Sequence, residues 1–135
     1  MTVEGEVVGS IGRGYLLFVG ILDGDTDEQG VWLAQKIAKL RLFDGADGTI
    51  NARSLQDIGG AALVISQFTL AGRTDKGNRP DYTQAAPPTH AKTLYESFVA
   101  HLREQGVGNV DTGRFGEHMQ VQLINDGPVT LLLER

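Results

Sequence analysis

Cysteine is absent from this chain, and so is any long run of apolar residues. Without cysteine the chain can form no disulfide, present no thiolate nucleophile and bind no metal through sulfur, which agrees with a reducing compartment. No apolar run approaches the ~18 residues that a membrane span needs. The opening residues, Met1 to Glu6, lack the basic and then apolar order of a signal peptide. These absences predict a cytoplasmic protein with no membrane segment.

Positive charge is also scarce. The chain has 12 lysines and arginines against 17 aspartates and glutamates, and its formal net charge is −5. An acidic chain is a poor non-specific binder of nucleic acid, because that affinity comes mainly from neutralising phosphates. Any contact with RNA must therefore be local. The 135 residues, 41% of them hydrophobic, fit a single domain, 1–135, because domains commonly run to ~100–150 residues.

The stretch from Gly60 to Leu70 is the centre of the chain's pattern. Its unbroken apolar run, Ala62 to Ile65, predicts a strand that is covered on both faces. Polar residues then arrive abruptly, at Ser66, Gln67 and Thr69. Rigid strand ends that lead into loops are common places for chemistry. The alternative is a half-buried strand on which the two hydroxyls simply alternate outward.

A basic loop follows this strand. The segment 71–82 contains Arg73, Lys76 and Arg79, which are the local cations expected of an RNA contact in an acidic chain. The alternative is an ordinary solvated loop.

The remaining pattern predicts an α+β domain with two helices and six or seven strands, in a barrel-like and mainly antiparallel sheet. We expect a hairpin of Thr2–Val8 with Tyr15–Ile21, and a helix from an N-cap at Asp25 to about Lys39. A second helix begins at Pro87-Pro88 and stops near Gly106, and two strands follow over 119–125 and 129–133.

The familiar catalytic motifs are missing. There is no Gly-x-Ser-x-Gly elbow, no His-Glu-x-x-His and no phosphate loop. His90 and His101 are about three helical turns apart, too far to share a metal. The acidic loop at 23–28 does not have the spacing of a calcium loop. A triad of His118 with Ser66 or Thr69 would need a contact that spacing does not reveal, and surface histidines are the alternative.

Two motifs resemble the signatures of the D-aminoacyl-tRNA deacylase (D-tyrosyl-tRNA deacylase) family, in the same order and at similar separation. They are Ser66-Gln67-Phe68-Thr69-Leu70 and Asn125-Asp126-Gly127-Pro128-Val129-Thr130. Gly113-Arg114-Phe115-Gly116, Met119, Arg79-Pro80 and the segment 5–20 are also similar to that family. The resemblance covers nearly the whole chain.

The resemblance implies a proofreading hydrolase that releases D-amino acids, or glycine mischarged on tRNA, from the terminal adenosine of tRNA. It implies a homodimer with active sites at the subunit interface and a contact with the tRNA 3′ end. We expect no cofactor and no metal in the site. The implied catalytic residues are Ser66, Gln67 and Thr69. The implied substrate-binding residues are Phe68, Arg79, Ala86, Phe115, Met119, Gly127 and Pro128.

Gly127-Pro128 is implied to be the chirality filter, acting across the dimer through a cis peptide bond that excludes L-amino acids. The alternative is an ordinary Asp-Gly turn before a strand-initiating proline. One departure is the absence of the family's first strand, which carries a Gln-Arg-Val segment; a misassigned start codon is the simpler explanation. The rival functions are a relative with a trans Gly-Pro that edits L-aminoacyl-tRNA, a synthetase editing domain, and a non-catalytic tRNA-binding module.

Overall fold

The computed structural model describes residues 1–135. Its elements, in chain order, are β1 (Thr2–Val3), β2 (Glu6–Val7), β3 (Gly14–Val19), α1 (Asp27–Lys39), β4 (Arg41–Phe43), β5 (Arg53–Ser54), β6 (Ala61–Ser66), the 3₁₀ turn η1 (Phe68–Ala71), α2 (Pro88–Glu104) and β7 (Asn109–Thr112). The α+β class and the two helices are as predicted. Neither helix is both long and apolar enough to cross a membrane.

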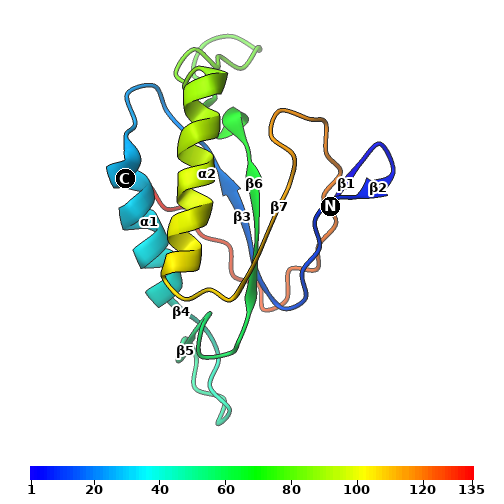
Figure 1. The fold of residues 1–135 in the computed structure, drawn as a ribbon, viewed down its shortest axis with the longest axis vertical. Helices are drawn as coiled ribbons and strands as arrows, with labels where there is room; N and C mark the ends of the chain where they lie inside the picture. Colours follow the sequence, from blue (N-terminus) through cyan, green and yellow to red (C-terminus); the bar gives the residue numbers. More distant parts are fainter.

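A three-stranded sheet in the order β3-β6-β7 forms the central layer (Figure 1). Both pairings are parallel: Gly14 to Val19 lie opposite Ala61 to Ser66, and β7 lies along the other edge of β6. Residues 61–65 are all buried, which confirms the predicted central strand. A strand with neighbours on both edges and apolar layers on both faces needs a continuous apolar run, and 61–65 supplies one.

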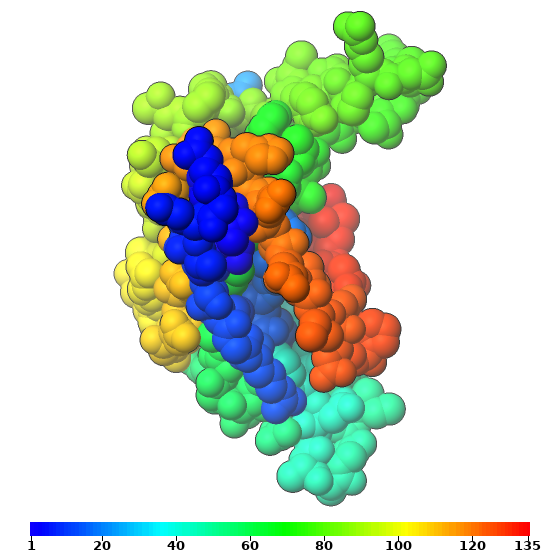
Figure 2. Space-filling model, turned by 90° about the vertical axis from the view of Figure 1, so that its right-hand side faces the viewer, coloured from blue at the N-terminus to red at the C-terminus, as the bar shows by residue number.

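The two helices cover one face of this sheet (Figure 1). The larger apolar cluster lies between them and the strands, and contains Ala34, Ile37, Ala38, Leu55, Ala62, Val64, Tyr95, Phe98, Val99, Leu102 and Val107. The other face of the sheet carries a smaller cluster, Met1, Val3, Leu63 and Ile65, with Met119 and Val121 packed against it. Figure 2 views the molecule from this side, where the first residues and the segment after β7 lie across the sheet. Successive residues of β6 therefore alternate between two apolar layers.

The first helix begins one residue later than predicted. Its N-cap is Thr26, which forms a capping box with Gln29. The Asp25 carboxylate instead accepts a hydrogen bond from the Leu22 backbone N–H at 2.8 Å, and so is not free to cap the helix. The second helix matches its prediction, and Gly106 follows it with a φ of +90°.

Two predictions about the sheet were wrong. The expected hairpin of Thr2–Val8 with Tyr15–Ile21 does not form, because β1 pairs with β2 in a two-residue hairpin and β3 pairs with β6. The main sheet is parallel; the antiparallel strand pairs are β1-β2 and β4-β5, and three isolated antiparallel bridges lie outside the strands. Burial explains why β3 pairs with β6, since the apolar side chains of β3 are removed from water more fully there than beside an exposed turn.

The segment from Val121 to Arg135 is extended but forms no strand. None of the backbone–backbone hydrogen bonds involves residues 121–135; the last is the reciprocal pair between Gln120 and Thr2. The strands predicted over 119–125 and 129–133 are therefore absent as hydrogen-bonded elements. Alternating apolar residues suit a strand, but a ladder also requires a neighbouring backbone.

Candidate active site

The central strand ends where its polar residues begin. Ser66 is the last residue of β6, and the backbone N–H of Gln67 donates to the Val19 carbonyl oxygen at 2.8 Å. The chain then turns into η1, so Thr69 lies in a 3₁₀ turn and not on a continued strand. The alternative in which both hydroxyls alternate along one strand is therefore excluded.

The Thr69 side chain is held by Gln67, the residue that caps the same turn. The side-chain amide of Gln67 donates to the Thr69 hydroxyl oxygen at 2.5 Å. A 3₁₀ turn leaves the N–H groups of its first residues, here Phe68 and Thr69, without a partner inside the turn. The site thus offers a hydroxyl and backbone donors, which suit the stabilisation of a developing oxyanion.

No side-chain base accompanies these donors. Neither the Ser66 nor the Thr69 hydroxyl has a hydrogen bond to an imidazole or a carboxylate. His90 bonds to the Asp25 carbonyl oxygen at 2.9 Å, and His101 to the Asp27 carboxylate at 3.0 Å. These two histidines join α2 to the start of α1. A serine or threonine nucleophile would require an adjacent base, so the geometry favours attack by water.

Two glycines that sequence reasoning missed set the position of η1. A β-carbon added at Gly20 would lie 2.9 Å from the Leu70 β-carbon and 3.3 Å from the Gln67 carbonyl oxygen. One added at Gly72 would lie 2.9 Å from the Thr69 carbonyl oxygen. Both sites require close approach of the backbone, which only glycine permits. The available signal was a glycine directly after the apolar strand 15–19.

Ala86 is brought to the same end of the sheet. Its backbone N–H donates to the Ile21 carbonyl oxygen at 2.9 Å, two residues after β3, and it is buried. The exposed ring of Phe68 meets Tyr82 edge-on, with ring centroids 5.3 Å apart. The segment 82–86 thus forms a wall beside η1.

Phe115 and Met119 pack on opposite faces of the sheet. The loop that carries them is attached by the Gly113 N–H, which donates to the Val64 carbonyl oxygen at 3.1 Å. Phe115 packs against Tyr95 at 6.0 Å between ring centroids, whereas Met119 packs in the smaller cluster with Ile65. Both therefore lie beside β6, one or two residues before Ser66.

The predicted basic loop forms an arm. Arg73 and Asp81 exchange two backbone hydrogen bonds of 2.8 Å, which close the exposed tip at 74–80 that contains Arg79. The Thr83 backbone N–H donates to the Asp81 carboxylate at 2.8 Å and lowers the pKa of that group. Figure 2 shows this loop extending away from the body of the molecule. Its cations are thus presented to solvent, next to η1.

The predicted cis bond at Gly127-Pro128 is wrong. The chain has no cis peptide bond, and Gly127 is an exposed bend with a φ of +135°. Trans is favoured before proline by about 0.5–1 kcal/mol, and the bend is exposed to solvent. The alternative of an Asp-Gly turn before a strand is met only in part, because the bend is there but no strand begins at Pro128.

These features define a small α+β domain in which a parallel strand delivers backbone donors and a hydroxyl to its carboxyl end. The sequence model of one protein family, described as D-Tyr-tRNA(Tyr) deacylase, matches residues 1–134. The chain belongs to this family.

Curated relatives agree over nearly the whole chain. A D-aminoacyl-tRNA deacylase of Halalkalibacterium halodurans is 55% identical over 134 residues, which are 99% of this chain and 90% of the relative. One of Dinoroseobacter shibae is 56% identical over 132 residues, or 98% of this chain and 90% of the relative.

Two solved structures have a similar fold. The c-Myc DNA unwinding element binding protein superposes with a TM-score of 0.93 at 39% identity, covering 99% of this chain and 90% of its own. A probable eukaryotic D-amino acid tRNA deacylase has a TM-score of 0.74 at 21% identity, covering 87% and 83%. The second likeness concerns the fold alone.

Proposed function

We propose that this protein is a D-aminoacyl-tRNA deacylase, which hydrolyses the ester between a D-amino acid and the terminal adenosine of tRNA. The family membership and the relatives at about 55% identity support this activity. The observation that locates the active site is the turn at the end of β6. There the Thr69 hydroxyl lies beside unpaired backbone N–H groups, and no side-chain base is hydrogen-bonded to it.

The chemistry requires little more than positioning. Water attacks the carbonyl carbon of the ester, negative charge develops on the carbonyl oxygen, and the carbon–oxygen bond to ribose breaks as that oxygen takes a proton. Backbone N–H groups of η1 and the Thr69 hydroxyl stabilise the oxyanion. Gln67 holds Thr69, and Ser66 ends the strand that positions both. The neighbouring ribose hydroxyl of the substrate assists proton transfer.

The remaining site residues shape the pocket. Phe68 and Ala86 form its walls beside η1, and Phe115 and Met119 support the strand from the two apolar layers. Arg79 contacts the 3′ end of the tRNA from the arm. Glycine, which has no side chain to exclude, is accepted as well as D-amino acids.

We further propose that the protein is a homodimer whose two sites lie at the subunit interface. Exposed apolar side chains support this: Ile124 is 93% exposed, Phe68 57% and Leu123 54%. Burying such side chains in an interface would remove apolar surface from water and so favour association. Gly127 and Pro128, which lie on the same extended segment, would then reach the partner's site and contact the substrate there.

An additional strand completes the sheet in this proposal. The unpaired backbone of residues 121–135 supports it, because fifteen residues without a ladder partner present many open donors and acceptors. Closure of a barrel would follow from such a strand. The test is an N-terminal extension of alternating apolar residues, which should raise the melting temperature and protect amides of 121–135 from hydrogen exchange; unchanged protection would contradict it.

The proposed activity is tested by comparing deacylation of D-tyrosyl-tRNA with that of L-tyrosyl-tRNA, with glycyl-tRNA as a third substrate. We expect rapid release of D-tyrosine and of glycine, and release of L-tyrosine at the spontaneous rate. Preference for the L substrate would support an L-editing relative instead. Binding without any turnover would support a non-catalytic tRNA-binding module.

A further inference from the structure

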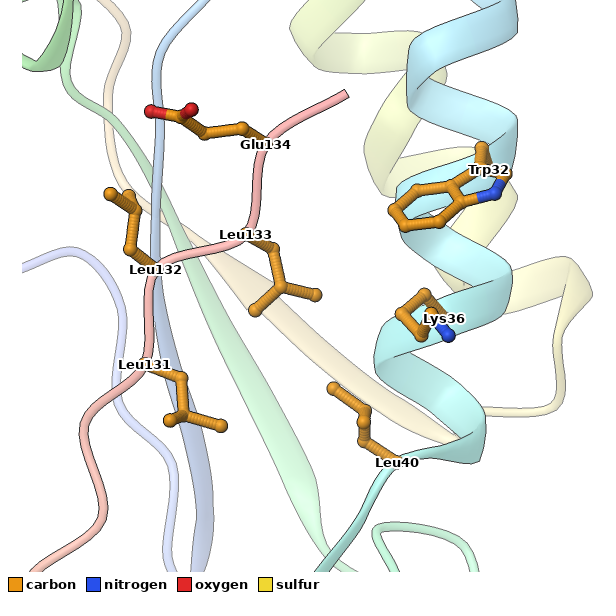
Figure 3. Close-up of a pocket in the computed structure, with 7 residues that line it drawn as sticks. All are labelled: Trp32, Lys36, Leu40, Leu131, Leu132, Leu133 and Glu134. Carbon is orange, nitrogen blue, oxygen red and sulfur yellow. The ribbon is translucent and has the colours of Figure 1, made fainter.

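A groove of about 360 Å³ lies between α1 and the extended segment Leu131–Glu134 (Figure 3). Leu131 and Leu133 point toward Leu40 across it, and together they form an apolar floor. None of its lining residues belongs to the site described above. It is therefore a second hollow, on a different part of the molecule from η1.

Trp32 forms the wall of this groove on the helix side. It is the only tryptophan in the chain, and two cations lie over its ring. The Lys36 ammonium is 5.4 Å from the ring centroid, and the Arg135 guanidinium carbon is 4.8 Å from it. A second hollow of about 200 Å³ adjoins the first, shares Trp32 and Lys36, and adds Gln35 and Lys39. The aromatic ring is thus half-buried at the junction of two hollows.

The charge here differs from that of the whole protein. Lys36, Lys39 and Arg135 form none of the ion pairs in the structure, and Glu134 is the only acidic residue that lines either hollow. The helix dipole accounts for lysines in the last turn of α1. It does not account for Arg135, which comes from a distant part of the chain to the same ring. In a chain of net charge −5, this is a local site for an anion beside an aromatic face.

We propose that the groove binds one nucleotide of the RNA substrate, at a position away from the aminoacyl ester. This inference rests on the proposed function for the presence of an RNA substrate. The base would displace a cation that now lies over the Trp32 ring and stack there above the leucine floor, and the phosphate would meet Lys36, Lys39 and Arg135. Aromatic stacking with flanking cations is the usual means by which proteins hold unpaired nucleotides, and it tolerates any base. Phosphate is the anion that complements the three cations.

The site carries its own reporter, because all tryptophan emission of the protein comes from Trp32. Titration with deacylated tRNA should quench this emission in a saturable way as the base stacks. The variant Lys36→Glu/Lys39→Glu should bind tRNA at least tenfold more weakly and reduce the salt slope of binding by about 0.7–0.9, the contribution of the one phosphate contact that is lost. The control Lys92→Glu changes an exposed lysine of α2 and should leave the tRNA affinity and the salt slope unchanged.

Kinetics separate this site from the catalytic one. On D-tyrosyl-tRNA the Lys36→Glu/Lys39→Glu variant should raise KM about tenfold and leave kcat unchanged. On D-tyrosyl-adenosine, which contains the ester but no further nucleotide, it should match the wild type. Equal effects on the two substrates, or saturable tRNA binding without a change in Trp32 emission, would overturn the proposal. If the wild type hydrolysed neither ester but its emission were still quenched by tRNA, the deacylase function would be wrong and the RNA site would stand.

Discussion

The side-chain amide of Gln67 donates a hydrogen bond to the hydroxyl oxygen of Thr69, two residues further along the chain, at 2.5 Å. The donor leaves the hydroxyl proton of Thr69 free to point toward a substrate oxygen. An amide nitrogen that donates cannot also act as a base for that proton. Thr69 is therefore arranged as a hydrogen-bond donor and not as a nucleophile.

The first prediction concerns how much the Thr69 hydroxyl contributes to the rate of deacylation. Thr69→Ala should keep substantial activity, with kcat lower by roughly tenfold to a hundredfold, because backbone donors of η1 remain. Ala86→Trp or a bulky change at Phe68 should abolish turnover by closing the pocket. Single-turnover deacylation of D-tyrosyl-tRNA measures both. Complete loss in Thr69→Ala, together with a trapped covalent ester on Thr69 of the wild type, would establish a nucleophile instead.

The second prediction uses Gly20 as a positioning residue. In Gly20→Ala the new methyl would lie 2.9 Å from the Leu70 β-carbon, so η1 must shift. A displacement near 1 Å can cost about a hundredfold in rate, and overpacking costs about 1–3 kcal/mol of stability. We expect kcat to fall about a hundredfold in deacylation kinetics, while thermal unfolding shows that the variant still folds. Gly12→Ala is the matched control, since no atom lies within 4 Å of the added carbon; equal losses in the two variants would remove the argument.

The sequence predicted the local pattern of the fold better than its pairing. The apolar run at Ala62–Ile65 identified a doubly covered strand, and Pro87-Pro88 and Gly106 identified the two ends of the second helix. The partner of β3 was wrong because strand pairing depends on burial between distant segments, which periodicity does not report. The N-cap was wrong by one residue because Asp25 has a competing local hydrogen bond.

Only part of the candidate site could be predicted, because contacts between distant segments are not visible in the sequence. Motif resemblance located Ser66, Thr69 and Ala86, which the structure brings to one end of the sheet. It did not locate Gly20 or Gly72, whose role depends on interatomic distances of about 3 Å across the fold. The cis bond at Gly127-Pro128 was inferred from the family motif, whereas this exposed bend has the trans bond that is favoured before proline.

The third prediction concerns the basic arm. Replacing Arg73, Lys76 and Arg79 by alanine should raise KM for D-tyrosyl-tRNA and flatten its salt dependence by about two to three, because up to three phosphate contacts are lost. The rate at saturating substrate should change little. Lys92→Ala, at an exposed lysine outside the arm, should behave as the wild type. An unchanged salt slope in the triple variant would mean that the arm is simply solvated.

The fourth prediction tests the dimer. Ile124 is 93% exposed in the single chain, so Ile124→Asp should not disturb folding of one subunit. It should nevertheless shift sedimentation from dimer to monomer and reduce deacylation, because the partner's segment would no longer reach the site. Ile50→Asp changes a residue that is 76% exposed but lies outside this segment, and it should leave sedimentation unchanged. A wild-type monomer at micromolar concentration would refute the proposed assembly.

The last prediction is a pH dependence of stability that comes from His101. Its ring contacts the Asp27 carboxylate at 3.0 Å and the Glu104 carboxylate at 3.4 Å. The hydrogen bond to Asp27, with a smaller contribution from Glu104, raises the pKa of His101 above its ordinary value of 6.5. Its folded form therefore binds a proton more tightly than its unfolded form.

This proton stabilises the folded chain fully below pH 6.5, where both states are protonated, and the stabilisation is lost as pH rises through the folded pKa. Urea unfolding between pH 5.5 and 9 should show stability falling across that interval, and the fall should be smaller in His101→Gln. His118→Gln, which changes an exposed histidine without a carboxylate partner, should keep the wild-type dependence. Because Asp27 begins α1 and His101 lies near the end of α2, Asp27→Asn should reduce the pH dependence as His101→Gln does. An unaltered pH profile in both variants would show that the pair contributes nothing to joining the helices.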